Sequence, residues 1–324
     1  MRPLAAAATA ALAALLGSLA PAAAAAQESP SIQWTLDRDA DAPREPGMVQ
    51  LNVEYLSPGG GRSMNGRSVP LRELQGLSAA QLASAAGTQV RFRLRRDAGN
   101  FACEGWARQE RGSGHCDFAA DAGFAAELAR RGIGRPTAAQ QFSLALHDVG
   151  LGFADELGSQ RYARPTVAEL VRAGEHGAGL EFLRGMGSLG FRMGTVESLV
   201  RVRDHGVTPR YVRELAAVGI RGLGAEELVR LRDHGVSAAF VREMAALGYG
   251  GLDAGEMVRM RDHGVSAAFV REMRELGYAG LPAAQLVRLR DHGVTADFVR
   301  RANARAGARR PVEELVRLRS RGER

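Results

Sequence analysis

An interval of 29 residues recurs along most of the chain without any change of length. Six histidines keep this spacing: His147, His176, His205, His234, His263 and His292. An aromatic residue keeps it through seven copies: Phe124, Phe153, Phe182, Tyr211, Phe240, Phe269 and Phe298. A fixed period of this size is typical of a stacked architecture, because each unit buries its apolar face on its neighbours. The sequence therefore predicts a repeat array.

Each copy contains the signals of two short helices, here called helix A and helix B. In one copy, Thr208 is a suitable N-cap for helix A, and Pro209 fits the first helical position. An apolar stripe then runs from Tyr211 to Val218. Gly219 follows in the place of a left-handed C-terminal residue. The pattern predicts a helix of about three turns.

Helix B follows after a short link and has its own start signal. Thr166 and Glu169 have the spacing of a capping box. Glu226 and Arg230 are expected to form a weak ion pair within the helix, since residues four apart are neighbours on its surface. The apolar positions expected to face inward in the same copy are Leu228, Val229 and Leu231.

Neither helix should be stable alone, because isolated helices shorter than about 12 to 15 residues are marginal in water. Stacking must stabilise them, and we expect the aromatic column to be core rather than a binding platform. The predicted fold is therefore multi-domain: a small antiparallel α+β domain at residues 27–117, then an all-α solenoid of seven 29-residue two-helix repeats at residues 118–324. The last copy is polar, as an exposed end cap requires.

Residues 1–26 have the composition of a secretory signal peptide. Arg2 precedes an Ala/Leu run that ends in small residues at Ala26. A membrane anchor is the alternative, but Gly17 and Pro21 interrupt the run. No later apolar stretch approaches the roughly 20 residues that a membrane helix needs. We therefore predict a soluble, exported protein of the periplasm or the extracellular space.

The α+β domain is indicated by alternating apolar and polar residues. Such strands are predicted within SIQWTL, across 48–56 and across 88–96. Residues 57–68 are expected to form a loop, and residues 69–87 one or two short helices. The prediction is four or five antiparallel strands with a helical excursion.

Two cysteines, Cys103 and Cys116, flank a Gly-rich segment at residues 111–114 that is expected to be a turn. If the segment folds as a hairpin, the two side chains face each other across the strands. In an oxidising compartment this arrangement predicts one disulfide. A catalytic or metal-binding thiol is the alternative, but only His115 lies near in sequence.

The net charge of +7 is concentrated at the C-terminus. Residues 300–324 hold nine arginines and three glutamates, a net charge of +6. A nucleic-acid-binding protein would spread its basic residues along a face, so we expect no nucleic-acid partner. The basic C-terminal tail is the one segment expected to be able to touch anionic lipid or cell-wall polymer. A solvated end cap is the simpler interpretation.

The histidine row suggests a series of metal or pH-sensing sites. Successive units of such a stack lie about 8 to 10 Å apart, whereas zinc binds nitrogen at about 2.0 to 2.1 Å. Shared coordination is therefore not expected. We expect each imidazole to lie in the last turn of helix B and to bond free backbone carbonyls. A role in pH sensing stays open.

The sequence contains no recognisable catalytic combination. Asp-His doublets such as Asp233-His234 resemble half of a catalytic pair. Adjacent residues of a helix do not face each other, however, and no serine or cysteine recurs in register with them. We expect no enzymatic activity, no metal and no cofactor. Chemistry confined to the N-terminal domain is the remaining alternative.

Two segments resemble known proteins. GVSAAFVREMAALGYGGLDAGEMVRMRDH is similar to repeats of exported bacterial proteins, and to repeats at the C-termini of some membrane metallopeptidases of the beta-lactam sensor-transducer type. VRFRLRRDAGNFACEGWARQERGSGHCDF is similar to a β domain that accompanies such repeats. The resemblance covers most of the chain after residue 26. Because the peptidase part and its zinc motif are absent from this sequence, no catalytic role is implied.

These features favour an exported, non-enzymatic interaction protein that binds a protein or peptide partner in the cell envelope through the concave surface of its solenoid. Partner choice would lie at outward positions of helix A that differ between copies: Arg210, Ala239, Ala268 and Asp297. The alternative is a sensor or regulatory partner of an envelope peptidase.

Overall fold

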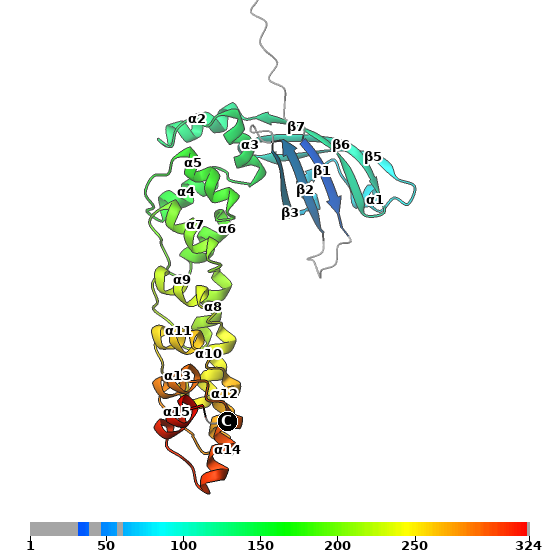
Figure 1. The fold of residues 1–324 in the computed structure, drawn as a ribbon. Helices are drawn as coiled ribbons and strands as arrows, with labels where there is room; N and C mark the ends of the chain where they lie inside the picture. The colour runs from blue at the N-terminus through cyan, green and yellow to red at the C-terminus, as the bar shows by residue number, and fades with distance from the viewer. Residues whose placement is uncertain (1–31, 39–46, 57–60, 323–324) are drawn as a thin grey trace, which may run out of the picture.

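The computed structural model describes residues 32–38, 47–56 and 61–322. The predicted signal peptide, residues 1–26, lies outside the described residues. The described chain forms a curved sheet domain and a long column of paired helices that extends away from one end of the sheet (Figure 1). The predicted combination of a small α+β domain and a helical repeat array is confirmed.

The N-terminal domain is one seven-stranded antiparallel sheet, curved like half of a barrel. Its strand order is β3-β2-β1-β7-β6-β5-β4. The strands are β1 (Ile32–Asp37), β2 (Met48–Leu56), β3 (Arg62–Pro70), β4 (Leu74–Gln75), β5 (Thr88–Arg96), β6 (Gly99–Arg108) and β7 (Arg111–Ala120). The predicted short helices are a 3-10 turn at Leu71–Glu73 and α1 (Ala79–Leu82), which Ser78 caps.

The prediction of four or five strands was too low, mainly because β3 was expected to be a loop. β3 pairs with β2 along its whole length, from Arg62 opposite Leu56 to Pro70 opposite Met48. Only Val69 of this strand is buried. An edge strand is held by backbone hydrogen bonds on one side and can do without an apolar face. β3 therefore lacks the hydrophobic alternation that reveals the other strands.

The expected Gly-rich turn at residues 111–114 was also wrong, because these residues belong to β7. The turn lies at Gln109 and Glu110, both with positive φ (49° and 65°). A Cβ on Gly112 would lie 3.0 Å from the Trp34 ring, and a Cβ on Gly114 would lie 2.0 Å from a carbonyl of β6. The glycines therefore make room for the indole and for close approach of the strands.

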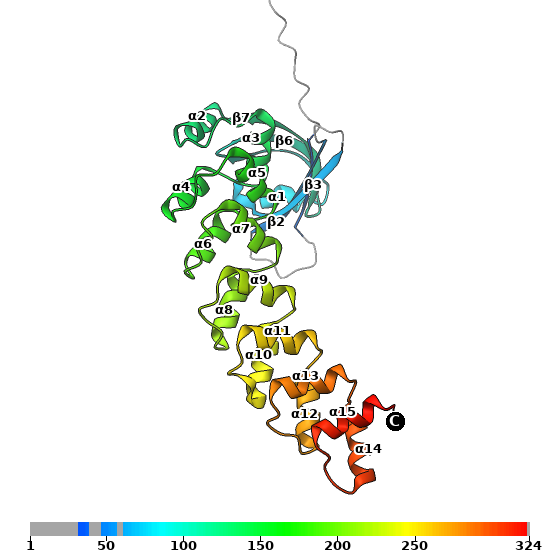
Figure 2. The same ribbon diagram turned by 60° about the vertical axis from the view of Figure 1, so that its left-hand side comes forward.

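The solenoid consists of seven helix pairs in two layers, which Figure 2 shows side by side. The helices of layer A are α2 (Ala122–Arg130), α4 (Leu151–Ser159), α6 (Leu180–Gly187), α8 (Pro209–Ala217), α10 (Ala238–Met244, continued by a π-helical turn at Ala245–Tyr249), α12 (Ala267–Glu275) and α14 (Ala296–Ala306). Those of layer B are α3 (Ala138–Leu146), α5 (Val167–Glu175), α7 (Val196–Asp204), α9 (Ala225–Asp233), α11 (Ala254–Asp262), α13 (Ala283–Asp291) and α15 (Val312–Ser320). The predicted number of pairs is confirmed.

The predicted helix ends are confirmed as well. The Thr208 hydroxyl accepts a hydrogen bond from the amide of Tyr211 at the start of α8. Thr166 and Glu169 form the expected capping box on α5. Gly219 adopts a left-handed conformation with φ of +95°. Local sequence signals thus set the length of each helix, and the constant length keeps the pairs in phase.

The sheet domain and the first helix pair share one core. Phe142 of α3 packs edge to face on Tyr55, Phe101 and Phe118, with ring centroids 5.0 to 5.8 Å apart. The buried amide of Gln141 donates to the carbonyls of Ala98 and Asp121. The first repeat is therefore anchored on the sheet, from which the remaining pairs extend.

Candidate interaction surface

The seven aromatic residues of helix A are core, as predicted: none is more than 7% exposed. They pack between the two layers with the valines and leucines of both helices. Tyr211 is the polar member of the column, and its hydroxyl donates to the carbonyl of Val236 at 2.7 Å. Burial raises the pKa of Tyr211 to about 12. The column therefore offers no exposed aromatic platform to a ligand.

A column of arginines lies over five of these rings. Each guanidinium comes from helix B of the same pair and lies 5.1 to 5.4 Å from the ring centroid: Arg203 on Phe182, Arg232 on Tyr211, Arg261 on Phe240, Arg290 on Phe269 and Arg319 on Phe298. Such contacts contribute about 0.5 to 1 kcal/mol each at exposed sites. Sequence reasoning missed them, although these arginines also recur every 29 residues.

The histidines form a ladder with carboxylates of the following repeat. The prediction that the imidazoles bond backbone carbonyls was wrong, because five of the six rings reach across to the next helix B and His147 reaches Asn65. The pairs join Nδ1 to Oδ1: His176 with Asp204 (2.7 Å), His205 with Asp233 (2.8 Å), His234 with Asp262 (2.7 Å) and His263 with Asp291 (2.5 Å). In the sequence, each of these aspartates follows its histidine by 28 residues, one fewer than the repeat length. This spacing is the signal that could have revealed the pairs.

The two ends of the ladder differ. His292 lies 3.2 Å from the hydroxyl of Ser320, which replaces the aspartate. His147 lies at the junction with the sheet, where its Nδ1 accepts a hydrogen bond from the Asn65 amide at 3.2 Å. Burial lowers the pKa of His147, and Arg67 lowers it further against the opposite effect of Glu175. The neutral ring is the form that can accept the Asn65 hydrogen bond.

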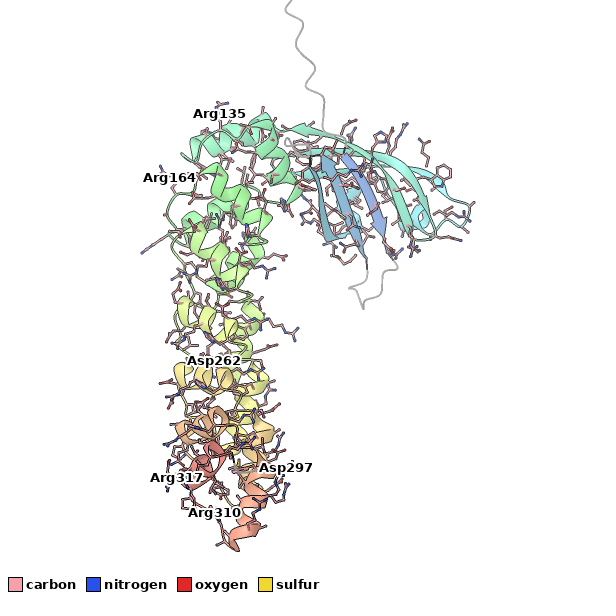
Figure 3. All side chains as sticks on the ribbon, in the orientation of Figure 1. Arg135, Arg164, Asp262, Asp297, Arg310 and Arg317 are labelled. Carbon is pink, nitrogen blue, oxygen red and sulfur yellow. A yellow bond between two sulfur atoms is a disulfide. The ribbon has the colours of Figure 1, made fainter. Side chains whose placement is uncertain are left out.

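The outward positions predicted on helix A are all exposed. Arg210, Ala239, Ala268 and Asp297 occupy the second position of α8, α10, α12 and α14. Arg210 pairs with Glu214 within α8, and Asp297 with Arg300 within α14. Figure 3 labels Asp297 on this layer and Asp262 on the opposite one. One face of layer A thus carries a cation, two methyl groups and an anion at equivalent places.

Layer B carries a second arginine column, at the positions equivalent to Arg201. The Arg201 guanidinium binds both carboxylate oxygens of Glu226 in the next repeat, at 3.0 and 2.9 Å. The expected pair of Glu226 with Arg230 inside one helix is not formed. Arg288 binds Glu313 in the same inter-repeat manner at 3.0 Å. These two ion pairs link neighbouring repeats on this surface.

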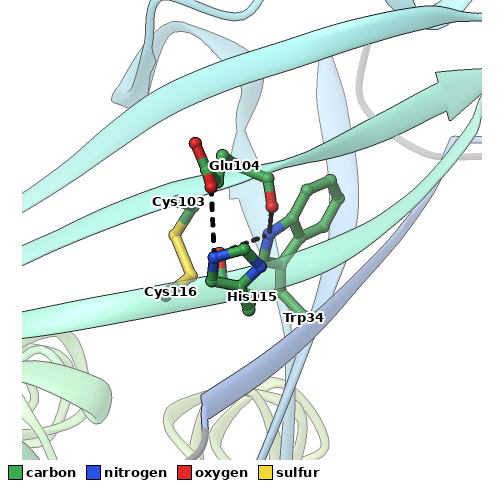
Figure 4. The surroundings of a disulfide bond; sticks show 5 residues. All are labelled: Trp34, Cys103, Glu104, His115 and Cys116. Carbon is green, nitrogen blue, oxygen red and sulfur yellow. Dashed lines mark hydrogen bonds and ion pairs between the residues drawn. A yellow bond between two sulfur atoms is a disulfide. The ribbon is translucent and has the colours of Figure 1, made fainter. Parts of the chain in front are cut away.

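The predicted disulfide is confirmed: Cys103 and Cys116 are directly opposite each other on β6 and β7. Figure 4 shows its surroundings, in which Trp34 Nε1 donates to the carbonyls of Glu104 and His115, at 3.2 Å each. The Glu104 carboxylate also binds His115 Nε2 at 3.2 Å. Both sulfurs are bonded to each other, so neither thiol is available for the alternative role in catalysis or metal binding.

Several C-terminal arginines belong to a folded end rather than to a free tail. The guanidinium of Arg309 lies over the Tyr278 ring. Arg310 donates to the carbonyl of Ala302 and pairs with Glu314. Arg319 donates to the carbonyl of Gly293. These cations therefore cap the last helix pair.

Within the described residues, no cluster of three or more His, Cys, Asp or Glu side chains could hold a metal ion. None of the described helices is both long and apolar enough to cross a membrane. The chain matches no model of a known protein family and no curated protein.

Proposed function

We propose that this chain is an exported, non-enzymatic scaffold that binds a protein or peptide partner through the surface of its solenoid. The observation that carries the proposal is the division between constant and varying positions. The aromatic column is invariant in character and buried. The equivalent exposed positions of layer A carry arginine, alanine, alanine and aspartate in turn. A constant frame with a varied surface suits recognition of an extended partner.

Export to an oxidising compartment is part of the proposal. The Cys103–Cys116 disulfide supports it, because disulfides persist mainly outside the reducing cytosol. The composition of residues 1–26 supports it independently.

Site-directed photo-crosslinking in the producing cell tests the proposal. A photoreactive residue at Ala239 or Ala268 should capture a defined partner, identified by mass spectrometry. The same residue at Ala86, which is exposed in the sheet domain, should not capture it. Capture at Ala86 alone would move the interaction to the sheet domain and contradict the proposal. A change in envelope peptidase activity on deletion of the protein would instead support the regulatory alternative.

A further inference from the structure

The arginine column of layer B continues through two consecutive repeat junctions at which the acid that binds Arg201 or Arg288 has no counterpart. The second residue of helix B is Glu226 in α9 and Glu313 in α15, and these are the acids that bind Arg201 and Arg288. At the equivalent position α11 has Gly255 and α13 has an alanine, Ala284. By analogy with Arg201 and Glu226, an acid at position 255 would bind Arg230, and an acid at position 284 would bind Arg259.

Among the residues that the structure describes, neither Arg230 nor Arg259 has an ion-pair partner. Both are exposed and line a depression of about 520 Å³ at α11. A Cβ built on Gly255 would meet only Asp253 Oδ1, at 3.3 Å. The missing side chain therefore leaves space beside two arginines that form no ion pair within the described residues.

The acids in this depression are already engaged. Asp253 and Glu256 accept hydrogen bonds from each other's backbone amides at the start of α11, at 2.8 and 3.1 Å. Asp262 binds the ring of His234. The two arginines are thus the groups left to meet a ligand.

We propose that Arg230 and Arg259 bind two carboxylates of an extended acidic peptide, which take the places that glutamates hold in the flanking repeats. This inference rests on the proposed function and adds a contact site on layer B to the varied positions of layer A. The bidentate Arg201–Glu226 contact is the template for each pair. Helices packed side by side lie about 8 to 10 Å apart. In an extended polyproline II chain, side chains three residues apart lie on one face and about 9 Å apart. The peptide should therefore carry acids three positions apart.

A nucleic acid fits this surface less well. The aspartates of the histidine ladder, Asp233, Asp262 and Asp291, run along the same layer beside the arginines. A dense line of phosphates would meet these carboxylates as well as the guanidinium groups. A peptide with two carboxylates brings fewer negative charges near these aspartates and matches the number of free arginines.

The test introduces glutamates at positions 255 and 284, so that carboxylates of the chain itself compete with those of an added peptide. A fluorescein-labelled peptide with Glu-Ser-Gly-Glu spacing is titrated into the full chain at low ionic strength, because salt screens exposed ion pairs. The wild type should bind this peptide about tenfold more tightly than a peptide with glutamine at both positions. The Gly255→Glu/Ala284→Glu variant should lose about tenfold in affinity for the glutamate peptide. The Ala217→Glu/Ala246→Glu variant adds the same charge at exposed positions of layer A, one repeat apart, and should stay within twofold of wild type.

Three results would overturn the inference. These are failure of the glutamate peptide to bind, equal binding of the glutamine peptide, and an equal loss of affinity in both double variants. Tighter binding of a single-stranded oligonucleotide would reassign the surface to phosphates. If photo-crosslinking at Ala239 or Ala268 still captures a partner and Gly255→Glu/Ala284→Glu does not weaken that capture, this inference fails while the proposed function stands.

Discussion

Replacement of Phe240 by alanine measures how far each repeat depends on its neighbours. The ring is 7% exposed and is covered on one side by the guanidinium of Arg261 at 5.4 Å. Burial of such a side chain contributes about 1.5 to 3 kcal/mol, and the guanidinium contact about 0.5 to 1 kcal/mol. The cavity left in the stack adds a further cost. The total for Phe240→Ala should be about 3 to 5 kcal/mol of unfolding free energy.

The assay uses the placement of the two tryptophans, Trp34 and Trp106, which both lie in the sheet domain. In urea unfolding of the full chain, far-UV circular dichroism follows mainly the solenoid, and tryptophan fluorescence follows the sheet. Phe240→Ala should shift the dichroism transition to lower urea and leave the fluorescence transition nearly in place. Ala239→Ser, at an exposed neighbouring position, should change stability by less than about 0.5 kcal/mol. A loss below about 1 kcal/mol for Phe240→Ala would mean that the ring is not core.

Three further predictions follow from the described contacts. Mass spectrometry of the exported protein should find Cys103 and Cys116 as a disulfide, and its reduction should cost about 2 to 3 kcal/mol of stability; free thiols at both positions would refute the hairpin pairing in the cell. The folded-state pKa of His147 is lowered below its usual 6.5, so its contribution to stability should be complete above pH 6.5 and fall as the pH drops below that value. His147→Gln should flatten this dependence in acid titrations, and an unchanged profile would count against the assignment. Asp262→Asn, which breaks an exposed pair with His234, should cost less than about 1 kcal/mol by urea unfolding, and a loss above 2 kcal/mol would show that the ladder is a main source of stability.

The helical array could be predicted from sequence because its signals are local. Caps such as Thr208, terminators such as Gly219 and the apolar stripe between them lie within one helix. Because these signals repeat at a constant length of 29 residues, the helix pairs stack in register. The exposed positions Ala239 and Ala268 could be predicted for the same reason, since each lies one residue from the buried aromatic.

Features that depend on contacts between repeats or strands were not predicted. The His234–Asp262 pair joins residues 28 apart, whose closeness depends on how the units stack. β3 was missed because an edge strand needs little apolar surface. The glycines of β7 were expected to form a turn, but Gly112 makes room for Trp34 of β1, a neighbouring strand that is distant in sequence. In each case the cause lies in tertiary packing.

Amide hydrogen exchange of the unmodified full chain tests the stacking of the repeats most directly. Short helices that shield one another should show slow exchange in the buried turns of α7, α9, α11 and α13 alike, around Val202, Leu231, Met260 and Leu289. Protection should fall toward α15, the last helix that the structure describes. Rapid exchange throughout these central helices, with slow amides only in the sheet domain, would contradict the account.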